Sequence, residues 1–275
     1  MSLPVDAILH HLGLHQPAPT LAFLDGLLRA WAGCFPWESA SRIARHRRPG
    51  APADHARRPE AFFADALRLG TGGTCFESNL ALHALLTALG YQSTLHFCDM
   101  KERGAWQIDP HSALIVTLDG QSYLADAGYP IPGVIRLAPA DPVVKETPVY
   151  RYEVVSVAPD RWEVRRKSGD FQQACFWLKG TPIDEDTFWA RLVRDHEPDG
   201  FFLSNVIIHR LDGVVIWRFD EDKGLVRRTV GREEPVPLTG AARADLPEAL
   251  AARFHLDARV IRSALTRTPP DGVWT

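Results

Sequence analysis

The sequence predicts an α+β fold, and three observations support this class. Apolar residues in roughly the first 90 positions recur at helical spacing, whereas from Tyr91 onward the chain breaks into short runs of β-forming residues separated by turn residues. A helical segment then leads to a last part that contains both strands and helices. We therefore expect a helical unit over 1–90, a β unit over 91–183, a connecting helix over 184–198 and a mixed unit over 199–275.

The first unit is predicted to be helical. One apolar stripe ends at Gly13, and a second follows Pro19 and Thr20, which are typical of a helix start. The Pro- and Arg-containing stretch 47–59 is expected to be a long loop, and a short helix is predicted over 60–69. The two stripes consist of Val5, Ile8, Leu9 and Leu12, and of Leu24, Leu27, Leu28 and Trp31.

The second unit contains the first β runs. Turn residues such as Pro159-Asp160 separate them, and the pattern indicates an antiparallel sheet or a small barrel. Residues 181–196 are expected to form the connecting helix, with Thr181 or Asp184 as its cap. The predicted runs cover 93–98, 111–127, 149–157 and 161–166.

The third unit is predicted to begin with a hairpin. Asp212-Gly213 is a dipeptide typical of tight turns, and it separates two apolar runs. Asp245 and Glu248 have the spacing of a capping box, which predicts a helix start. Strands are expected over 203–211, 214–219 and 225–230.

A glycine turn before an apolar helix contains the first candidate functional residue. In Thr71-Gly72-Gly73-Thr74-Cys75 the turn leads into helical spacing from Phe76 to Leu89, and Gly90 stands where a left-handed C-terminal cap belongs. Cys75 therefore lies in the first turn, where free N–H groups and the helix dipole stabilise a thiolate. We interpret it as a nucleophile if a base lies near. Without a base, such a cysteine is more often a small buried apolar residue.

His111 and Asp126 are the candidate base and its partner. Two β runs are joined by Asp119-Gly120, which is a strong hairpin signal. Counting outward from a Leu118–Gln121 pair makes His111 and Asp126 diagonal neighbours on one face of the hairpin. They can then complete a set of nucleophile, base and orienting carboxylate. Without Cys75, His111 and Asp126 would be interpreted as ordinary exposed residues at strand ends or in turns.

These motifs resemble those of the arylamine N-acetyltransferase family. The resemblance rests on Gly72-Gly73-x-Cys75-Phe-Glu-x-Asn79 and on the segment from His111 through two strands to Asp126-x-Gly-aromatic. It extends to Phe35-Pro-Trp-Glu-Ser39, to Phe202-Leu-Ser-Asn205 and to a closing helix around 246–256. It therefore covers nearly the whole chain.

The resemblance implies both a fold and an activity. The fold would be an N-terminal helical bundle, a central antiparallel β-barrel and a C-terminal α/β lid, with a core like that of cysteine proteases. The activity would be that of a Cys75-His111-Asp126 acyltransferase, which takes an acetyl group from acetyl-coenzyme A (acetyl-CoA) and passes it to an aromatic amine or hydrazine. Acetyl-CoA would act as a co-substrate, and no tightly bound cofactor is implied.

Three departures from the family pattern bear on donor docking and acceptor choice. The family usually has arginine before the two glycines, where this chain has Thr71. Its Asp-Val-Gly-Phe-Gly run is here Asp126-Ala-Gly-Tyr-Pro130, and Trp37 replaces a phenylalanine. The three triad positions themselves match the family.

Further site residues are assigned around the triad. Trp37 and Tyr129 can form an aromatic wall on which a flat amine stacks, and Pro130 would narrow the same pocket. Plain core packing is the alternative for the two aromatic rings. The turn Gly72, Gly73, Thr74 offers N–H groups to a donor anion or a developing oxyanion, although adjacent glycines alone are a weak signal.

Composition argues against several other classes. A net charge of −3 does not fit a general binder of nucleic acid or anionic membranes, and the basic cluster Arg45-His46-Arg47-Arg48 is interpreted as a solvated loop. No apolar run approaches the roughly 18 residues of a membrane span, and no leader pattern is evident, so we expect a cytoplasmic protein.

The four cysteines are widely spaced and include no C-x-x-C motif. Neither a disulfide framework nor a metal site is therefore predicted. Cys34, Cys98 and Cys175 are expected to be buried structural residues.

Three alternative functions remain open. An amide synthase of the same family would load Cys75 with a polyketide or peptide acyl chain from a carrier protein, and the departures at Thr71 and Pro130 keep this alternative open. A transglutaminase-like or papain-like hydrolase shares the triad arrangement and would cleave peptides without coenzyme A. A non-catalytic binding protein would bind its ligand unchanged without Cys75. The sequence carries no signal for the oligomeric state or for the identity of the acceptor.

Overall fold

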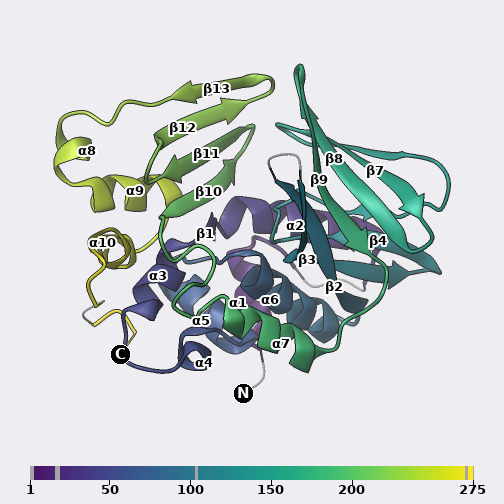
Figure 1. The fold of residues 1–275 in the computed structure, drawn as a ribbon, viewed down its shortest axis with the longest axis horizontal. Coiled ribbons are helices and arrows are strands. Elements are labelled where there is room, and N and C mark those ends of the chain that lie inside the picture. The colour runs from purple at the N-terminus through teal and green to yellow at the C-terminus, as the bar shows by residue number, and fades with distance from the viewer. Residues whose placement is uncertain (1–2, 16–18, 103–104, 270–271, 275) are drawn as a thin grey trace.

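The computed structural model describes residues 3–15, 19–102, 105–269 and 272–274, and it has three parts (Figure 1). A group of N-terminal helices lies against a nearly closed, barrel-like sheet of eight strands, and a five-stranded sheet carries the C-terminal helices. The predicted α+β class is confirmed, with helices first, a barrel second and a mixed unit last.

Regular elements occupy most of the described chain. The helices within it are α1 (Val5–His11), α2 (Leu21–Cys34), α3 (Ala40–His46), α4 (Pro52–His55), α5 (Pro59–Leu69), α6 (Cys75–Ala88), α7 (Glu185–Arg194), α8 (Ala241–Ala244), α9 (Leu246–Phe254) and α10 (Ala258–Thr266). The strands are β1 (Trp37–Glu38), β2 (Gln92–Glu102), β3 (Ala105–Leu118), β4 (Gln121–Ala125), β5 (Ile135–Arg136), β6 (Val143–Glu146), β7 (Arg151–Ala158), β8 (Arg161–Ser168), β9 (Phe171–Lys179), β10 (Ile207–Asp212), β11 (Val215–Asp220), β12 (Gly224–Thr229) and β13 (Arg232–Pro235).

Several helix starts are fixed by side chains that accept backbone hydrogen bonds, and Asp245 and Asp257 do so at the starts of α9 and α10. Thr20 accepts from the N–H of Phe23 at the start of α2 (3.2 Å), and Asp184 accepts from the N–H of Thr187 at the start of α7 (2.8 Å). Asp184 is thus the cap of the connecting helix. This helix is shorter than the predicted range 181–196 because it begins only after Asp184 and ends at Arg194.

The first two turns of helix α6 are enclosed on all sides, which explains their mostly apolar sequence. Its residues from Cys75 to Leu82 are all buried, and it packs against α5, β2 and β3. Gly90 follows its last turn with φ +85°, the left-handed conformation that its position predicts. The helix therefore joins the helical part to the barrel and holds Cys75 at a fixed point between them.

The β3–β4 hairpin has the predicted register. Asp119 and Gly120 both have positive φ, 49° and 70°, as a type I′ turn requires. Leu118 pairs with Gln121, and the ladder continues to the end of β4, so that Asp126 follows directly at the open end of the hairpin. The strand order of the barrel is β5-β4-β3-β2-β9-β8-β7-β6, and its edge strands β5 and β6 approach each other.

The second sheet includes a strand from the N-terminal part. Strand β1 pairs with β10, which places Trp37 opposite His209, and the order is β1-β10-β11-β12-β13. Helices α3, α9 and α10 share one apolar core with this sheet, which includes Ile43, Phe219 and Phe254. This long-range pairing brings Trp37 to the junction of the three parts.

Some predicted boundaries are wrong. Asp212 pairs with Val215, so the β10–β11 loop consists of Gly213 and Val214, one residue later than predicted. Gly213 takes the positive φ of this turn, +58°, which glycine adopts without strain. The predicted loop 47–59 contains α4, which begins at a proline, a residue favoured in the first helical turn. Elements β9, α3 and α10 were not predicted.

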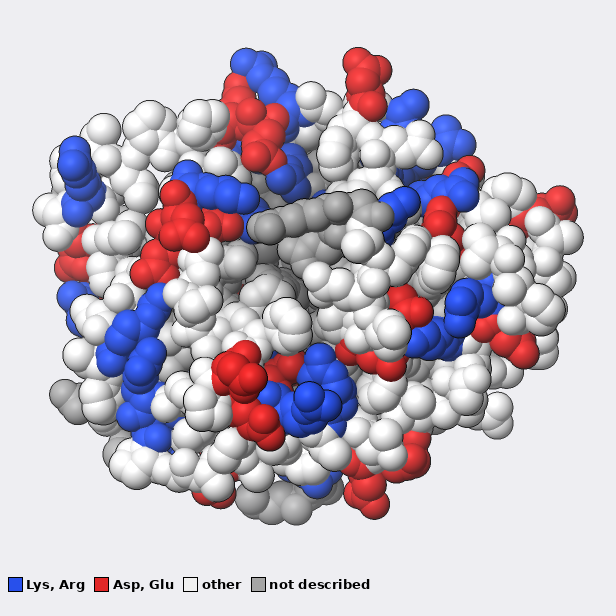
Figure 2. Space-filling model, viewed as in Figure 1, with Lys and Arg blue, Asp and Glu red and all other residues white. Residues whose placement is uncertain are grey.

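The interpretation of the basic cluster Arg45-His46-Arg47-Arg48 as a solvated loop is wrong. Arg45 lies in α3, is 2% exposed and pairs with Glu77 at 2.6 Å, whereas Arg48 is exposed. On the face shown in Figure 2, basic and acidic side chains alternate in small groups. No helix among the described residues is both long enough and apolar enough to cross a membrane.

The apolar cores cross the unit boundaries expected from the sequence. Phe188 and Leu192 of α7 pack into the core of the N-terminal helices, and Ile43 and Leu69 belong to the core of the second sheet. The division at about 90, 183 and 198 therefore stays a prediction.

Candidate active site

Cys75 is the first residue of α6 and is 6% exposed. The turn before it must approach another backbone closely, because a Cβ on Gly72 would lie 1.7 Å from the carbonyl oxygen of Pro36. Gly128 contacts Cys75 from the barrel side, where a Cβ would lie 2.5 Å from the Cα and Cβ atoms of the cysteine. Both glycines are thus required by space, and they hold Cys75 between the helices and the barrel.

His111 and Asp126 form a hydrogen-bonded pair beside this cysteine. His111 Nε2 and Asp126 Oδ2 are 2.8 Å apart, and both residues are buried. Burial by itself would lower the pKa of His111, but Asp126 and, to a smaller extent, Cys75 raise it to about 10. The imidazole is therefore protonated at neutral pH, and because Nε2 faces Asp126, Nδ1 is the nitrogen left for proton exchange with the thiol.

Asp126 is held in place by a set of donors. Its Oδ1 accepts from the backbone N–H groups of Gly128 and Tyr129, both at 2.8 Å, and from the side-chain amide of Asn79 at 3.1 Å. The Asn79 oxygen in turn accepts from the N–H of Ala127 at 2.9 Å. Asn79 was given no role from the sequence, although it stands one helical turn after Cys75 and so shares its face of α6.

A buried ion cluster supports the turn before the cysteine. Arg57 donates to the carbonyl oxygen of Gly72 (2.5 Å), to Thr71 Oγ1 (3.1 Å) and to Glu77 (2.9 Å), and Arg45 pairs with the same carboxylate. Burial would raise the pKa of Glu77, but Arg45 and Arg57 hold it well below its usual value. Arg57 therefore forms a hydrogen bond with Thr71, the residue that stands where the family usually has arginine.

The other thiols lie in different surroundings. All four cysteines are free; Cys98 and Cys175 are buried as expected, whereas Cys34 is only partly buried, contrary to the prediction. Burial raises the pKa of all three thiols, most of all that of Cys98. None of the three lies at a helix start beside an imidazolium.

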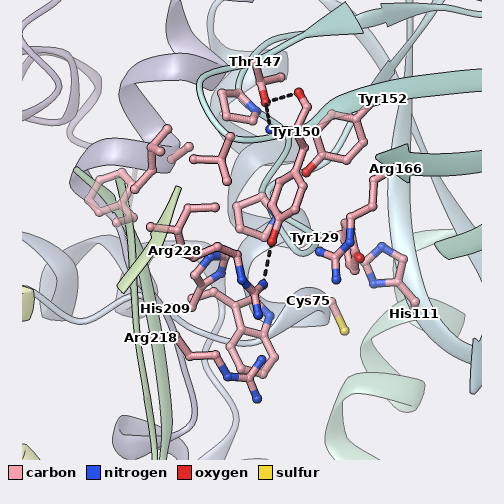
Figure 3. Close-up of a pocket in the computed structure, with 18 of the residues that line it drawn as sticks. Cys75, His111, Tyr129, Thr147, Tyr150, Tyr152, Arg166, His209, Arg218 and Arg228 are labelled. Atoms are coloured by element: carbon pink, nitrogen blue, oxygen red, sulfur yellow. Dashed lines mark hydrogen bonds between the residues drawn. The ribbon is translucent and has the colours of Figure 1, made fainter. Parts of the chain in front are cut away.

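A cavity of about 200 Å³ opens above Cys75 and His111 (Figure 3). Trp37, Tyr129 and Pro130 line it, and their roles in substrate binding stay a prediction. The turn Gly72, Gly73, Thr74 is buried outside the lining, so its donor and oxyanion roles stay a prediction. The wall also contains Tyr150, Tyr152, Arg166, His209, Arg218 and Arg228, which sequence reasoning missed because they are far apart in the chain.

The described residues contain no group of three or more His, Cys, Asp or Glu side chains arranged to hold a metal ion. The reactive groups gathered at the site are the Cys75 thiol, the His111 imidazole and the Asp126 carboxylate. A cysteine at a helix start beside a buried histidine–aspartate pair defines a class of cysteine-centred proteins suited to acyl transfer or hydrolysis.

The family follows from comparison with known proteins. Residues 21–258 match the family model described as N-acetyltransferase, which is most of the chain. The chain belongs to this family, which is the arylamine N-acetyltransferase family that its motifs resemble.

Solved structures share the fold along nearly their whole length. The chain is similar to the arylamine N-acetyltransferase of Mycobacterium marinum (19% identity, TM-score 0.80, 95% of this chain and 96% of that chain). It is equally similar to the arylamine N-acetyltransferase of M. smegmatis (19% identity, TM-score 0.80, 97% of this chain and 99% of that chain). A structure of the M. marinum protein in complex with CoA also matches (18% identity, TM-score 0.80, 96% of this chain and 99% of that chain). At such low identities the likeness shows the fold alone.

Two curated relatives match shorter regions. The chain is 36% identical over 85 residues to "Proansamycin X synthase" of Amycolatopsis mediterranei, covering 30% of this chain and 33% of that protein. It is 33% identical over 75 residues to "Arylamine N-acetyltransferase 1" of Homo sapiens, covering 26% of this chain and 25% of that protein. The matches thus span about a third and about a quarter of these relatives.

Proposed function

We propose that this protein transfers an acetyl group from acetyl-CoA to an aromatic amine or hydrazine through an acyl-cysteine. In the first half-reaction, the Cys75 thiolate attacks the thioester carbonyl carbon and a new carbon–sulfur bond forms. The bond between that carbon and the coenzyme sulfur breaks, and the imidazolium of His111 gives its proton to the departing thiolate. Asp126 keeps the histidine in the required orientation.

The second half-reaction releases the product. The amine nitrogen attacks the carbonyl carbon of acyl-Cys75, and His111, now neutral, accepts a proton from the nitrogen. The carbon–sulfur bond to Cys75 then breaks, which restores the thiolate and the imidazolium. Because the coenzyme leaves before the amine reacts, the kinetics are ping-pong.

Donor and acceptor are inferred from chemistry and from the relatives. The M. marinum structure in complex with CoA supports an acyl-CoA co-substrate, and the names of the solved relatives support an arylamine acceptor. Stacking against Tyr129 and Trp37 suits a flat ring. A cytoplasmic location is part of this proposal, because free thiols persist in a reducing compartment.

The observation that carries the proposal is the buried, hydrogen-bonded His111–Asp126 pair beside a cysteine at a helix start. Incubation with acetyl-CoA and intact mass measurement should give one acetyl group per chain, located on Cys75. Cys75→Ala should remain unmodified, and Cys98→Ala, which removes a buried thiol outside the cavity, should still be acetylated. Acetylation of Cys75→Ala would refute the assignment of the nucleophile.

An amide synthase is the second candidate, and the match to Proansamycin X synthase favours it. In that case Cys75 would be loaded with a long acyl chain from a carrier protein. The small cavity argues for the first candidate. A panel of acetyl, long-chain acyl and carrier-bound thioesters separates the two, because the better donor acylates Cys75 faster. Family membership disfavours the hydrolase and the non-catalytic binding protein.

A further inference from the structure

Arg166 is a cation without a carboxylate partner among the described residues. It reaches from β8 into the cavity, where its guanidinium carbon lies 4.9 Å from the ring centre of Tyr129 and 4.7 Å from that of Tyr150. Its Nη2 donates to the Gln173 side chain at 3.2 Å, and its Nε is buried without a hydrogen-bond partner. Ring contacts alone leave this donor unsatisfied, which costs free energy unless a ligand supplies an acceptor.

Two more arginines reach the same cavity from the opposite side (Figure 3). Arg228 of β12 donates to the hydroxyl of Tyr150 at 2.5 Å and pairs with Glu233. Arg218 of β11 pairs with Asp220 at 2.8 Å. Their own carboxylates balance these charges, whereas no Asp or Glu stands among the described residues that line the cavity. The interior of the cavity is thus positively charged.

His209 adds a neutral donor to this wall. Burial, followed by the charges of Arg218, Arg166 and Arg228, lowers its pKa to about 3, so the imidazole is uncharged at neutral pH. Its Nε2 is buried and has no hydrogen-bond partner. In the tautomer that carries the proton on Nε2, this group is a second unused donor in the same cavity.

The position of Arg166 relates it to the acceptor rather than to the donor phosphates. The Tyr129 ring contacts Arg166 on one side and His111 on another, with ring centres of Tyr129 and His111 6.1 Å apart. Tyr129 therefore contacts both the guanidinium and the histidine beside Cys75. The long pantetheine arm of CoA separates its phosphates from the thioester by much more than one aromatic ring. An aromatic amine that attacks acyl-Cys75 would instead direct its far end toward Arg166.

We propose that Arg166 and His209 form an anion subsite, and that the acceptor amine carries a carboxylate. A guanidinium binds a carboxylate through two parallel hydrogen bonds, and Nε together with one Nη provides that fork. Arg166 would thus be a specificity-determining residue. This inference rests on the proposed acyl transfer in the same cavity.

The kinetic test compares 4-aminobenzoate with 4-aminobenzamide, which has nearly the same shape but no charge, using acetyl-CoA as donor. The ratio of kcat/KM for the acid to kcat/KM for the amide should fall by about tenfold or more in Arg166→Gln. In Arg166→Lys, which keeps the charge but cannot form two parallel hydrogen bonds, this ratio should fall less. Differences in amine nucleophilicity cancel because each ratio is compared between variants of the same protein.

Arg165→Gln is the matched control. Arg165 is the adjacent residue on β8, pairs with Glu163 and Glu153, and does not line the cavity. Its selectivity ratio should equal that of the unchanged protein. An unchanged ratio in Arg166→Gln, or an equal fall in Arg165→Gln, would overturn the subsite.

Two further arms identify the source of the anion and separate this inference from the proposed function. If Arg166→Gln slows acetylation of Cys75 by acetyl-CoA as much as it slows transfer to 4-aminobenzoate, the anion belongs to the donor and the inference is wrong. Calorimetry measures the affinity of the Cys75→Ala variant for 4-aminobenzoate. This affinity should be about tenfold lower in the double variant that also carries Arg166→Gln. That difference supports the subsite even if no amine is acetylated, whereas no difference refutes it.

Discussion

At the residue scale, His111 depends on Asp126 for both its charge and its orientation. Asp126→Asn can still accept the N–H groups of Gly128 and Tyr129 through its remaining oxygen, but it presents an amide donor to Nε2. Nε2 must then accept, the proton moves to Nδ1, and the imidazole can no longer take a proton there. We expect transfer to fall about 10³-fold or more and alkylation of Cys75 by iodoacetamide to shift to higher pH.

The same substitution should change stability in a pH-dependent way. The pKa of His111 is about 10 in the folded protein against 6.5 for the free group, so the pair stabilises the fold fully below pH 6.5, and this stabilisation is lost as the pH rises toward 10. Asp126→Asn should lower the free energy of unfolding by about 2 kcal/mol at pH 6 and by progressively less toward pH 10.

Asp119→Asn, in the exposed turn of the same hairpin, controls for the chemical change itself. Urea unfolding at several pH values measures both variants. An Asp126→Asn loss that does not depend on pH, or an alkylation profile that does not move, would contradict the role given to Asp126.

At the element scale, the turn before α6 depends on an arginine that is distant in sequence. Arg57 bonds to Thr71, Gly72 and Glu77 together, and Arg57→Met would leave Glu77 buried with one guanidinium fewer. We expect the free energy of unfolding to fall by about 3 kcal/mol, because the loss of one partner leaves a buried charge poorly compensated. The rate of Cys75 acetylation should fall as well, because the turn positions the nucleophile.

Arg58→Met is the matched control for this prediction. Arg58 is adjacent and exposed, and its guanidinium lies over the Trp189 ring, so we expect a loss below about 1 kcal/mol and unchanged acetylation. Denaturant unfolding and the acetylation time course measure both effects. Similar losses in the two variants would show that Arg57 does not support the turn.

The elements also show what the sequence can and cannot predict. The start of α6 and the register of β3–β4 were predicted because they depend on local signals, a glycine turn and Asp119-Gly120. The pairing of β1 with β10 joins residues about 170 positions apart, and a two-residue strand such as Trp37–Glu38 has no periodicity to detect. The positions of Arg57 and Arg166 follow from tertiary packing, so local patterns carry no signal for either.

At the scale of the whole molecule, the cavity exists only where the three parts meet. Cys75 comes from the helical part, Tyr129 and Arg166 come from the barrel, and Arg228 comes from the second sheet. Under the proposed mechanism, donor and acceptor would react in turn at this one cavity, as a ping-pong order requires. Selectivity for the amine then depends on the shape that the three parts leave above the acyl-cysteine.

Pro130 lies in this wall and tests that conclusion. It is bulkier and stiffer than the glycine usual in the family, so Pro130→Gly should widen the cavity and raise kcat/KM for bulkier arylamines relative to a small one by about tenfold. Pro159→Gly, in the exposed β7–β8 turn away from the cavity, should leave this ratio unchanged. Steady-state rates over a grid of acetyl-CoA and amine concentrations should give parallel double-reciprocal lines for all three proteins. Intersecting lines without a detectable acyl-protein would rule out the covalent route, and an unaltered ratio in Pro130→Gly would exclude this residue from acceptor selection.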